Sequence, residues 1–315
     1  MPHIALSFVA FALALNLAPP PVSKASRQVV VTVDDLPVVT RVFADDAGRE
    51  RITSRLVSAI TRQHVPAVGF VNEGKMYRDG AVQPTQVALL RQWVDAGLEL
   101  GNHSYSHFDL HTTDATVFIR DALAGDSITR AVMARAGRQP RYFRHPFLHT
   151  GRDLTTRAHL DDSLTAHGYR VAPVTIDNSD YVFATAYERA LGSRDSAGAR
   201  RIGDEYLEYM TQVFAYYERQ SVTLVGREIP QVLLIHASAL NADTFDRMAS
   251  MMRARGYAFV TLDAALADSA YRSADTYVGP AGITWLHRWA LTRGLRGAVF
   301  AGEPEVPAHI AAAAR

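Results

Sequence analysis

The sequence predicts an α/β fold, a distorted (β/α)7 barrel with a helical insertion between its fifth and sixth strands. Short apolar runs rich in β-branched residues alternate with amphipathic stretches of helical length. This alternation indicates a parallel sheet covered by helices, and the even spacing of the runs favours a closed or nearly closed barrel. A hydrophobic content of 48% in 315 residues is sufficient for the large core of such a fold.

Seven segments have the composition of buried strands. Each is short and apolar and ends at a polar residue, a proline or a turn, as strands of a parallel sheet do. We therefore expect all of them in one parallel sheet. They cover residues 27–33, 67–71, 98–102, 141–144, 169–176, 231–235 and 257–261.

Helices are predicted between the strands, because apolar residues recur there every three or four positions. In residues 83–96, for example, Val87, Leu90 and Val94 fall on one face and Gly97 ends the helix. The other predicted helices of this kind cover residues 50–63, 114–136, 154–167 and 242–255.

Two segments depart from the alternation of strands and helices. Residues 184–230 separate the fifth strand from the sixth and contain a glycine- and arginine-rich loop, 192–203, followed by an amphipathic helix over 205–219. We expect this insertion to lie over one rim of the barrel. The barrel domain is expected to span residues 26–278, with a C-terminal helical tail, 279–315, packed on its outside.

The N-terminus has most features of an export signal. Its apolar run of about 14 residues, from Ile4 to Leu17, suits the core of a signal peptide and is short for a membrane span. The usual positive charge before this run is missing, because His3 stands there instead of Lys or Arg. A lipid-surface anchor is the alternative. Residues 1–25 are therefore predicted to be a signal peptide, and the protein to be periplasmic or secreted.

Composition excludes several classes of function. The chain has no cysteine, which rules out thiolate catalysis, zinc–cysteine sites and disulfides. Its only lysines are Lys24, in the expected leader, and Lys75, so Schiff-base chemistry is disfavoured. A formal charge of +1 without any basic run gives no case for nucleic acid as a partner. No later stretch is long and apolar enough to span a membrane.

Ionisable side chains follow five of the seven predicted strands. Each has an ordinary explanation when taken alone, such as a turn cap, an ion pair or a buried histidine. Barrels of parallel strands, however, collect their reactive groups where strands end and the following loops begin. We therefore expect one cavity lined by Asp34 and Asp35, His103 with His107, Arg144, Asp177 with Asp180, and His236.

Two histidines and one carboxylate form a common catalytic zinc shell, with a fourth position open for water. His103 and His107 are four positions apart, so on a helical turn both would lie on one face. The carboxylate is either Asp34 or Asp35. Adjacent residues that leave a strand point in different directions, so one can bind metal while the other acts as a general base. His236 is suitably placed to protonate a leaving group.

Residues 32–35, Thr-Val-Asp-Asp, and residues 103–107, His-Ser-Tyr-Ser-His, resemble the first two motifs of a known family. That family is the polysaccharide deacetylases, the family-four carbohydrate esterases with a NodB-like domain, whose motifs are T-F-D-D-G and H-[ST]-x-x-H. The resemblance implies that Asp34 is the general base and that Asp35 is a metal ligand together with both histidines.

Two later segments are similar to further motifs of this family. Residues 144–147, Arg-His-Pro-Phe, resemble R-x-P-[YF], which implies that Arg144 orients the base and that the backbone N–H of Phe147 helps to hold the oxyanion. By this resemblance His145 and Phe147 lie against the substrate. Leu-Ile-His before Ala237 resembles L-x-H, which implies that His236 is the general acid.

Residues 177–181 resemble the remaining motif, D-x-x-D-W. The resemblance implies that a carboxylate, Asp177 or Asp180, braces the arginine and that Tyr181 lines the acetyl pocket. Tyr181 replaces the usual tryptophan, Leu36 replaces the glycine of the first motif, and the insertion is atypical. These departures concern the substrate more than the chemistry.

The resemblance covers residues 28–266 and implies a metal-dependent hydrolase that removes N- or O-linked acetyl groups from a glycan. Zn2+ is the expected cofactor, with Co2+, Ni2+ and Fe2+ as alternatives for this donor set. The expected partner is an acetylated glycan or a small acetylated molecule, without nucleic acid and without a membrane span. Two alternatives stay open: an amide or imide hydrolase acting on a small non-glycan substrate, and a non-catalytic carbohydrate-binding protein on the same scaffold.

Other histidines compete for the role of ligand. His111 continues the spacing of His103 and His107, and it is an alternative to Asp35 as the third ligand. His145 and His149 form a second H-x-x-x-H pair, but the proline between them disfavours a continuous helical face.

Overall fold

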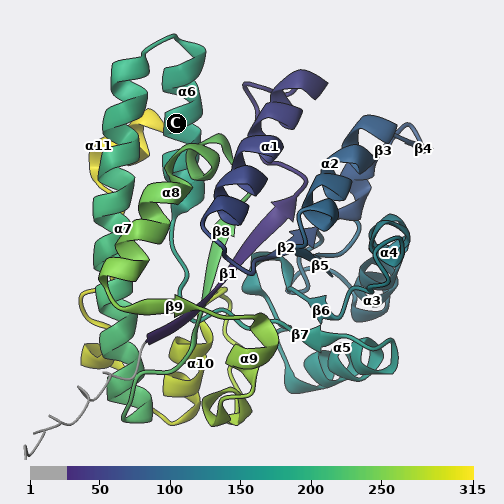
Figure 1. The fold of residues 1–315 in the computed structure, drawn as a ribbon. Coiled ribbons are helices and arrows are strands. Elements are labelled where there is room, and N and C mark those ends of the chain that lie inside the picture. Colours follow the sequence, from purple (N-terminus) through teal and green to yellow (C-terminus); the bar gives the residue numbers. More distant parts are fainter. Residues whose placement is uncertain (1–26) are drawn as a thin grey trace, which may run out of the picture.

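Strand β1 (Arg27–Leu36) is the central strand of the protein, and its four valines are completely buried. A strand covered on both faces has a continuous apolar sequence, as expected for a parallel sheet between layers of helices. The computed structural model describes residues 27–315 (Figure 1). The predicted signal peptide, residues 1–25, lies outside the described residues.

All seven predicted strands are present in one parallel sheet, which confirms the predicted α/β class. Its strand order is β7-β6-β5-β2-β1-β8, and β9 pairs with the start of β1. Besides β1, the strands are β2 (Val68–Val71), β5 (Glu99–Asn102), β6 (Tyr142–Phe143), β7 (Arg170–Val171), β8 (Gln231–His236) and β9 (Tyr257–Phe259).

The sheet curls until its two edge strands are connected by one segment. β7 pairs with β6, and the chain then continues to Ile176, which forms a parallel bridge with Leu233 of β8. The predicted fifth strand, 169–176, thus touches both ends of the strand order and produces a distorted barrel. β9 does not take a separate place in this ring. It pairs with the start of β1, and Val29 of β1 has pairing partners in both β8 and β9.

Helices cover the outside of the sheet, and most begin and end within a few residues of the predicted positions. One prediction is wrong in detail, because the helix expected over 114–136 is interrupted at Gly125. A Cβ atom at Gly125 would lie 2.5 Å from the backbone carbon of Ser104, so only glycine allows the chain to pass this close to that loop. The helices concerned are α1 (Asp46–Arg62), α2 (Pro84–Asp95), α3 (Ala115–Ala124), α4 (Ser127–Ala134), α5 (Leu154–Ala166) and α8 (Ala239–Ala254).

The segment between β7 and β8 forms two helices, α6 (Asp180–Gly192) and α7 (Ser196–Val225), which pack beside α8 (Figure 1). The loop predicted over 192–203 is largely helical, which corrects the sequence-based expectation. Asp195 caps α7 by accepting a hydrogen bond from Gly198 N at 2.8 Å. The glycines of this stretch are therefore accommodated within a helix and do not form a long loop.

The C-terminal tail adds short elements to the outer layer, and its Trp285, Leu286 and Trp289 are buried. His287 accepts or donates a hydrogen bond with Tyr216 of α7 at 2.9 Å. Among residues 27–315, no helix combines the length and apolar character needed to cross a membrane. The remaining strands and α-helices are the hairpin of β3 (Tyr77–Arg78) and β4 (Ala81–Val82), and helices α9 (Leu262–Leu266), α10 (Trp285–Thr292) and α11 (Ala308–Ala313).

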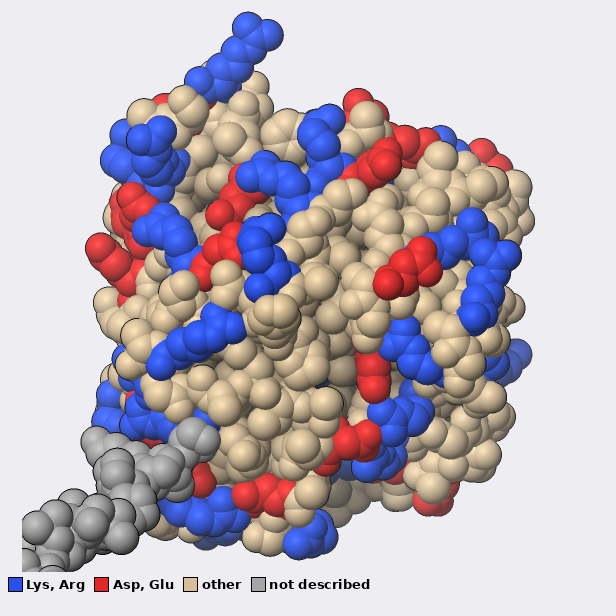
Figure 2. Space-filling model, viewed as in Figure 1, with Lys and Arg blue, Asp and Glu red and all other residues tan. Residues whose placement is uncertain are grey.

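Basic and acidic side chains are interspersed on the face of the protein seen in Figure 2, in keeping with the formal charge of +1. Some of them form ion pairs between helices, such as Arg62 of α1 with Asp246 of α8. Exposed pairs of this kind contribute little to stability. The fold is held mainly by the buried sheet and the apolar helix faces packed on it.

We expect Gly101→Ala to lower the free energy of unfolding by about 1–3 kcal/mol, the usual cost of overpacking. Gly101 lies in β5, and a Cβ atom there would be 2.6 Å from Cε1 of Phe70 and 3.0 Å from the carbonyl oxygen of Tyr142. Urea unfolding measures the change. Gly203→Ala in α7 is the matched control, because its Cβ would meet Thr244 at an ordinary 3.4 Å. Equal losses in both variants would contradict this packing argument.

Candidate active site

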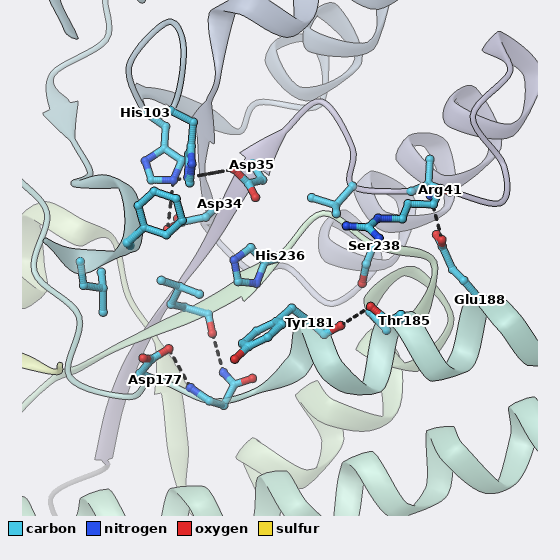
Figure 3. A pocket seen from close by; sticks show the side chains of 18 of the residues that line it. Asp34, Asp35, Arg41, His103, Asp177, Tyr181, Thr185, Glu188, His236 and Ser238 are labelled. Carbon is cyan, nitrogen blue, oxygen red and sulfur yellow. Dashed lines mark hydrogen bonds and ion pairs between the residues drawn. The ribbon is translucent and has the colours of Figure 1, made fainter. Parts of the chain in front are cut away.

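A cavity of about 740 Å³ opens where the sheet strands end (Figure 3). Two of the predicted site residues, Arg144 and Asp180, are fully buried and contact residues that line the cavity. The other predicted residues all line it, so the expected convergence of distant strand ends is present in the structure. These are Asp34, Asp35, His103, His107, His145, Phe147, Asp177, Tyr181 and His236.

The two aspartates at the end of β1 have different surroundings. The pairing of β1 with β2 is irregular between Val33 and Leu36, and Asp35 has a left-handed φ of 68°. Lys75 holds this turn by donating a hydrogen bond from Nζ to the carbonyl oxygen of Asp35 at 2.7 Å. As a result the Asp34 carboxylate faces Arg144, whereas the Asp35 carboxylate faces the histidines.

Asp35, His103 and His107 bring three donor atoms within 4.8 Å of one another. Oδ1 of Asp35 lies 3.5 Å from Nε2 of His107 and 3.9 Å from Nε2 of His103. Burial alone would raise the pKa of Asp35, but the charges of Lys75 and His236 outweigh it and hold the pKa below its ordinary value. The carboxylate is therefore ionised and available to a cation.

The two histidines do not lie on a helical turn, so that part of the prediction is wrong. Ser104 and His107 both have positive φ values, 64° and 56°, and the chain between them is bent. Asn102 Oδ1 accepts a hydrogen bond from Ser104 N at 2.7 Å, and Ser104 Oγ accepts one from His107 N at 3.0 Å. These local bonds bring the rings together, with centroids 4.9 Å apart.

His103 is oriented as a metal ligand requires. Its Nδ1 lies 2.8 Å from the carbonyl oxygen of Arg144. A carbonyl only accepts hydrogen bonds, so Nδ1 carries the proton and Nε2 keeps its lone pair towards the aspartates. Burial, together with the neighbouring His107, lowers the pKa of His103 to about 3. One carboxylate and neutral imidazoles fit Zn2+, Co2+, Ni2+ or Fe2+.

Asp34 has the environment of a general base. Its Oδ2 lies 3.4 Å from Nη1 of Arg144, whose Nη2 donates a hydrogen bond to Thr32 at 2.9 Å. Among residues 27–315, Oδ1 of Asp34 has no hydrogen-bond partner. Burial raises the pKa of Asp34 to about 6, although the charges of Arg144 and His236 oppose the shift. A carboxyl group with this pKa is ionised and moderately basic near neutral pH.

His236 has the environment of a general acid. Its Nδ1 lies 2.7 Å from Oδ1 of Asp180, and its backbone N–H donates to Oδ2 of the same carboxylate at 2.7 Å. Asn241 donates a further hydrogen bond to Asp180 at 2.7 Å. Burial alone would lower the pKa of His236, but Asp180, Asp35 and Asp34 raise it to about 10. The imidazole is therefore protonated near neutral pH.

Asp180 and Asp177 interact with different residues. Asp180 pairs with His236, a partner that no local pattern of residues indicates. The charges of Asp34 and, to a lesser extent, Asp177 oppose the lowering of the Arg144 pKa by burial, and Oδ1 of Asp177 accepts a hydrogen bond from Asn178 N at 2.8 Å. Burial raises the pKa of Asp177 to about 6. Of the two carboxylates suggested as a brace for Arg144, only Asp177 is near it electrostatically.

The predicted substrate-side residues differ in exposure. The Phe147 and Tyr181 side chains are 53% and 58% exposed, although most large apolar side chains here are buried. Phe147 lies in a 3-10 turn (Pro146–Leu148), with its ring centroid 4.5 Å from that of His107. The Tyr181 ring centroid is 6.3 Å from that of His236. His145 also lines the cavity but is almost completely buried.

The cavity extends beyond the predicted residues to a further wall, of which sequence reasoning missed the part at residues 39–42. Residues 39–42, which follow β1, and α6 form this wall (Figure 3). Glu188 of α6 connects its two sides by accepting a hydrogen bond from Arg41 N at 3.0 Å. The inserted helices thus contribute directly to the shape of the cavity.

Residues 22–171 match the family model described as polysaccharide deacetylase. This match shows that residues 22–171 carry a polysaccharide deacetylase domain, the NodB-like domain of that family. The family resemblance inferred from the sequence is confirmed. A search of the curated proteins finds no match.

Several solved structures are similar to this chain. A polysaccharide deacetylase from Bacillus cereus has a TM-score of 0.49 and 16% identity, covering 75% of this chain and 91% of its own. A family 4 acetyl xylan esterase from Clostridium thermocellum, in complex with a cobalt ion, has a TM-score of 0.47 and 22% identity, with coverage of 76% and 91%. A CE4 family pseudoenzyme from Bacillus anthracis has a TM-score of 0.48 and 19% identity, with coverage of 77% and 66%.

Proposed function

We propose that the protein is a metal-dependent deacetylase that removes N- or O-linked acetyl groups from a glycan. The observation that carries the proposal is the convergence of three kinds of group in one cavity. Asp34 supplies a base, Asp35 with the two histidines supplies a donor set for a metal, and His236 supplies an acid. A non-catalytic relative would have no need to keep all three.

Asp35, His103 and His107 would hold the divalent cation, with Zn2+ as the first candidate. A cation bound there supplies activation of water and polarisation of the acyl carbonyl. Asp34 removes a proton from the attacking water, and Arg144 orients the Asp34 carboxylate through the contact described above.

His236 completes the reaction by donating its proton to the leaving nitrogen or oxygen as the acyl bond breaks. The products are acetate and a free amine or hydroxyl group. Asp180 holds the Nδ1 side of the ring, so the Nε2 side is left to face the substrate. Phe147 and Tyr181 line the acyl side of the cavity, and the backbone N–H of Phe147 stabilises the oxyanion.

Acetate release tests the proposal directly. The protein is incubated with chitooligosaccharides, acetylated xylan and peptidoglycan, with and without a chelator. We expect release from at least one glycan, loss of release after chelation, and recovery with Zn2+ or Co2+. Glycan binding without release would support a non-catalytic carbohydrate-binding protein, and hydrolysis confined to small amides or imides would support the other alternative.

We also propose that the protein is exported, so that it meets its substrate outside the cytoplasm. The support is the apolar run from Ile4 to Leu17 at the N-terminus. Fractionation of cells that express the full chain, with sequencing of the mature N-terminus, tests this proposal. Recovery of the uncleaved chain from the cytoplasm would contradict it.

We expect Asp180→Asn to move the basic limb of the pH–kcat/KM profile to lower pH. Asp180 opposes the effect of burial and raises the pKa of His236 to about 10, so removal of its charge lowers that pKa. The protonated acid is then lost at a lower pH as pH rises. His236→Ala is the companion variant and should lack this limb. An unchanged limb in Asp180→Asn would show that the group that titrates there is not His236.

A further inference from the structure

The wall formed by residues 39–42 and α6 carries positive charge that the proposed reaction does not use. Arg41 and Arg189 line the cavity on this side, together with Glu188. The Glu188 side chain is buried, with only 6% of the residue exposed, whereas both arginines are exposed. The charge that a ligand can reach on this wall is therefore positive.

Glu188 is bonded to the backbone of the opposite segment and not to an arginine side chain. Its Oε2 accepts hydrogen bonds from Arg41 N at 3.0 Å and from Val42 N at 3.5 Å. On the other side of Arg41, Val39 N donates to the carbonyl oxygen of Ala237 at 2.7 Å. These bonds fix the backbone before and after Arg41, so its side chain starts from a fixed position.

The guanidinium of Arg41 is available to a ligand. Figure 3 shows the side chain directed away from Glu188 and into the cavity, beside Ser238. Within residues 27–315, the backbone N–H is the only group of Arg41 that donates a hydrogen bond. Arg189 differs, because its guanidinium donates to backbone carbonyl oxygens of the C-terminal tail. Of the two arginines, Arg41 is thus the one whose charge has no protein partner in this part of the chain.

Arg41 lies in the same cavity as the proposed catalytic groups but acts on a different part of it. A cavity of about 740 Å³ holds far more than an acetyl group, since pockets of this size take drug-sized ligands. The cations with the largest effects on the pKa values of the two aspartates of β1 are Arg144 and Lys75, and Arg41 is not among the main contributors. Arg41 therefore faces a portion of a bound molecule other than the acetyl group.

We infer that Arg41 selects glycans that carry a carboxylate close to the acetylated sugar. The planar guanidinium of arginine can donate two parallel hydrogen bonds to the two oxygens of a carboxylate. Its single charge also matches a carboxylate better than a phosphate monoester, which carries nearly two. The inference rests on the proposed deacetylase function of the same cavity and adds the class of substrate.

The test compares substrates that differ only in this charge. Hyaluronan oligosaccharides carry a carboxylate on the sugar next to each N-acetyl group, and methyl esterification removes the charge. Disaccharides of N-acetylmuramic acid, with free or methyl-esterified carboxylates, provide a second pair. For at least one pair we expect kcat/KM for acetate release to be about 10–100-fold higher for the acid, the range for a hydrogen bond to a charged group. High salt should reduce this ratio.

Variants of Arg41 assign the preference to this side chain. Arg41→Gln should bring the acid-to-ester ratio close to one by lowering kcat/KM for the acid alone, and Arg41→Lys should keep part of it, because lysine retains the charge but not the planar fork. Arg51→Gln is the matched control, since Arg51 is an exposed arginine of α1 that does not line the cavity. A ratio near one for both pairs in the wild type, or a ratio that Arg41→Gln leaves unchanged, would overturn the inference and leave deacetylation intact.

Calorimetric binding of the same oligosaccharides separates the inference from the proposed function. If no glycan releases acetate, the deacetylase proposal fails. Selection of a carboxylate then requires the acid to bind about 10-fold more tightly than its ester in the wild type and equally in Arg41→Gln. Binding of neither member of either pair, without acetate release, would contradict it.

Discussion

Asp34→Asn is expected to retain the bound metal and to reduce kcat by about 10²–10⁴-fold, the range expected for the loss of a general base. The amide has the shape of the carboxylate but cannot accept a proton from water. Burial gives Asp34 a raised pKa of about 6, which suits a base, and the guanidinium of Arg144 lies 3.4 Å from it. Metal content by elemental analysis and kcat by acetate release measure the two effects separately.

The assignment of Asp34 as base rests on its distances and on the charge beside it. Nε2 of His103 is nearly equidistant from the two carboxylates, at 3.8 Å from Asp34 and 3.9 Å from Asp35. Only Asp35 also approaches His107, at 3.5 Å. The positive charge of Arg144 opposes a cation at Asp34. If Asp34→Asn lost the metal and Asp35→Asn kept it, the two roles would be reversed.

Asp35→Asn and His103→Ala are each expected to lose the cation of the active site and, with it, all activity above background. Asp35 supplies the anionic donor and His103 supplies a neutral lone pair that is fixed by the Arg144 carbonyl. Zinc content and acetate release, measured on the same samples, report the loss. Asp162→Asn, an exposed carboxylate-to-amide change, is the matched control and should keep both.

Two further measurements would distinguish the loss of a metal ligand from a simple folding defect. The variants should unfold cooperatively in urea, because the cavity is formed by strands that do not depend on the metal. High Zn2+ concentrations should restore some activity to Asp35→Asn, in which two ligands remain. Wild-type zinc affinity at this site in either variant would contradict the proposed donor set.

The strands and the cavity were predictable from the sequence because both depend on local patterns. Each buried strand is a continuous apolar run, and the reactive residues directly follow those runs. Asp34 and His103 are examples, since each stands at or just after the end of its strand. The parallel arrangement then brings such residues together even though they are far apart along the chain.

The details that were not predicted depend on contacts between distant segments. Gly125, where the predicted helix is interrupted, packs on the backbone of Ser104, and no local pattern reports that contact. Asp180 pairs with His236 across 56 positions of the chain. Lys75 is the only lysine of the chain after Lys24, and this rarity is the one indication in the sequence that it has a specific role. Its hydrogen bond to the Asp35 carbonyl depends on the fold and could not be predicted.

The pairing of β1 with β8 has a consequence for how substrate preference can change in this protein. Asp34 and His236 are direct partners in the register of these two strands. The separation of the proposed proton acceptor and proton donor is therefore set by backbone hydrogen bonds of the barrel. The walls contributed by residues 39–42 and by α6 belong to surface segments instead. Insertions or substitutions there can change the shape of the cavity while the spacing of the two proposed proton carriers stays constant.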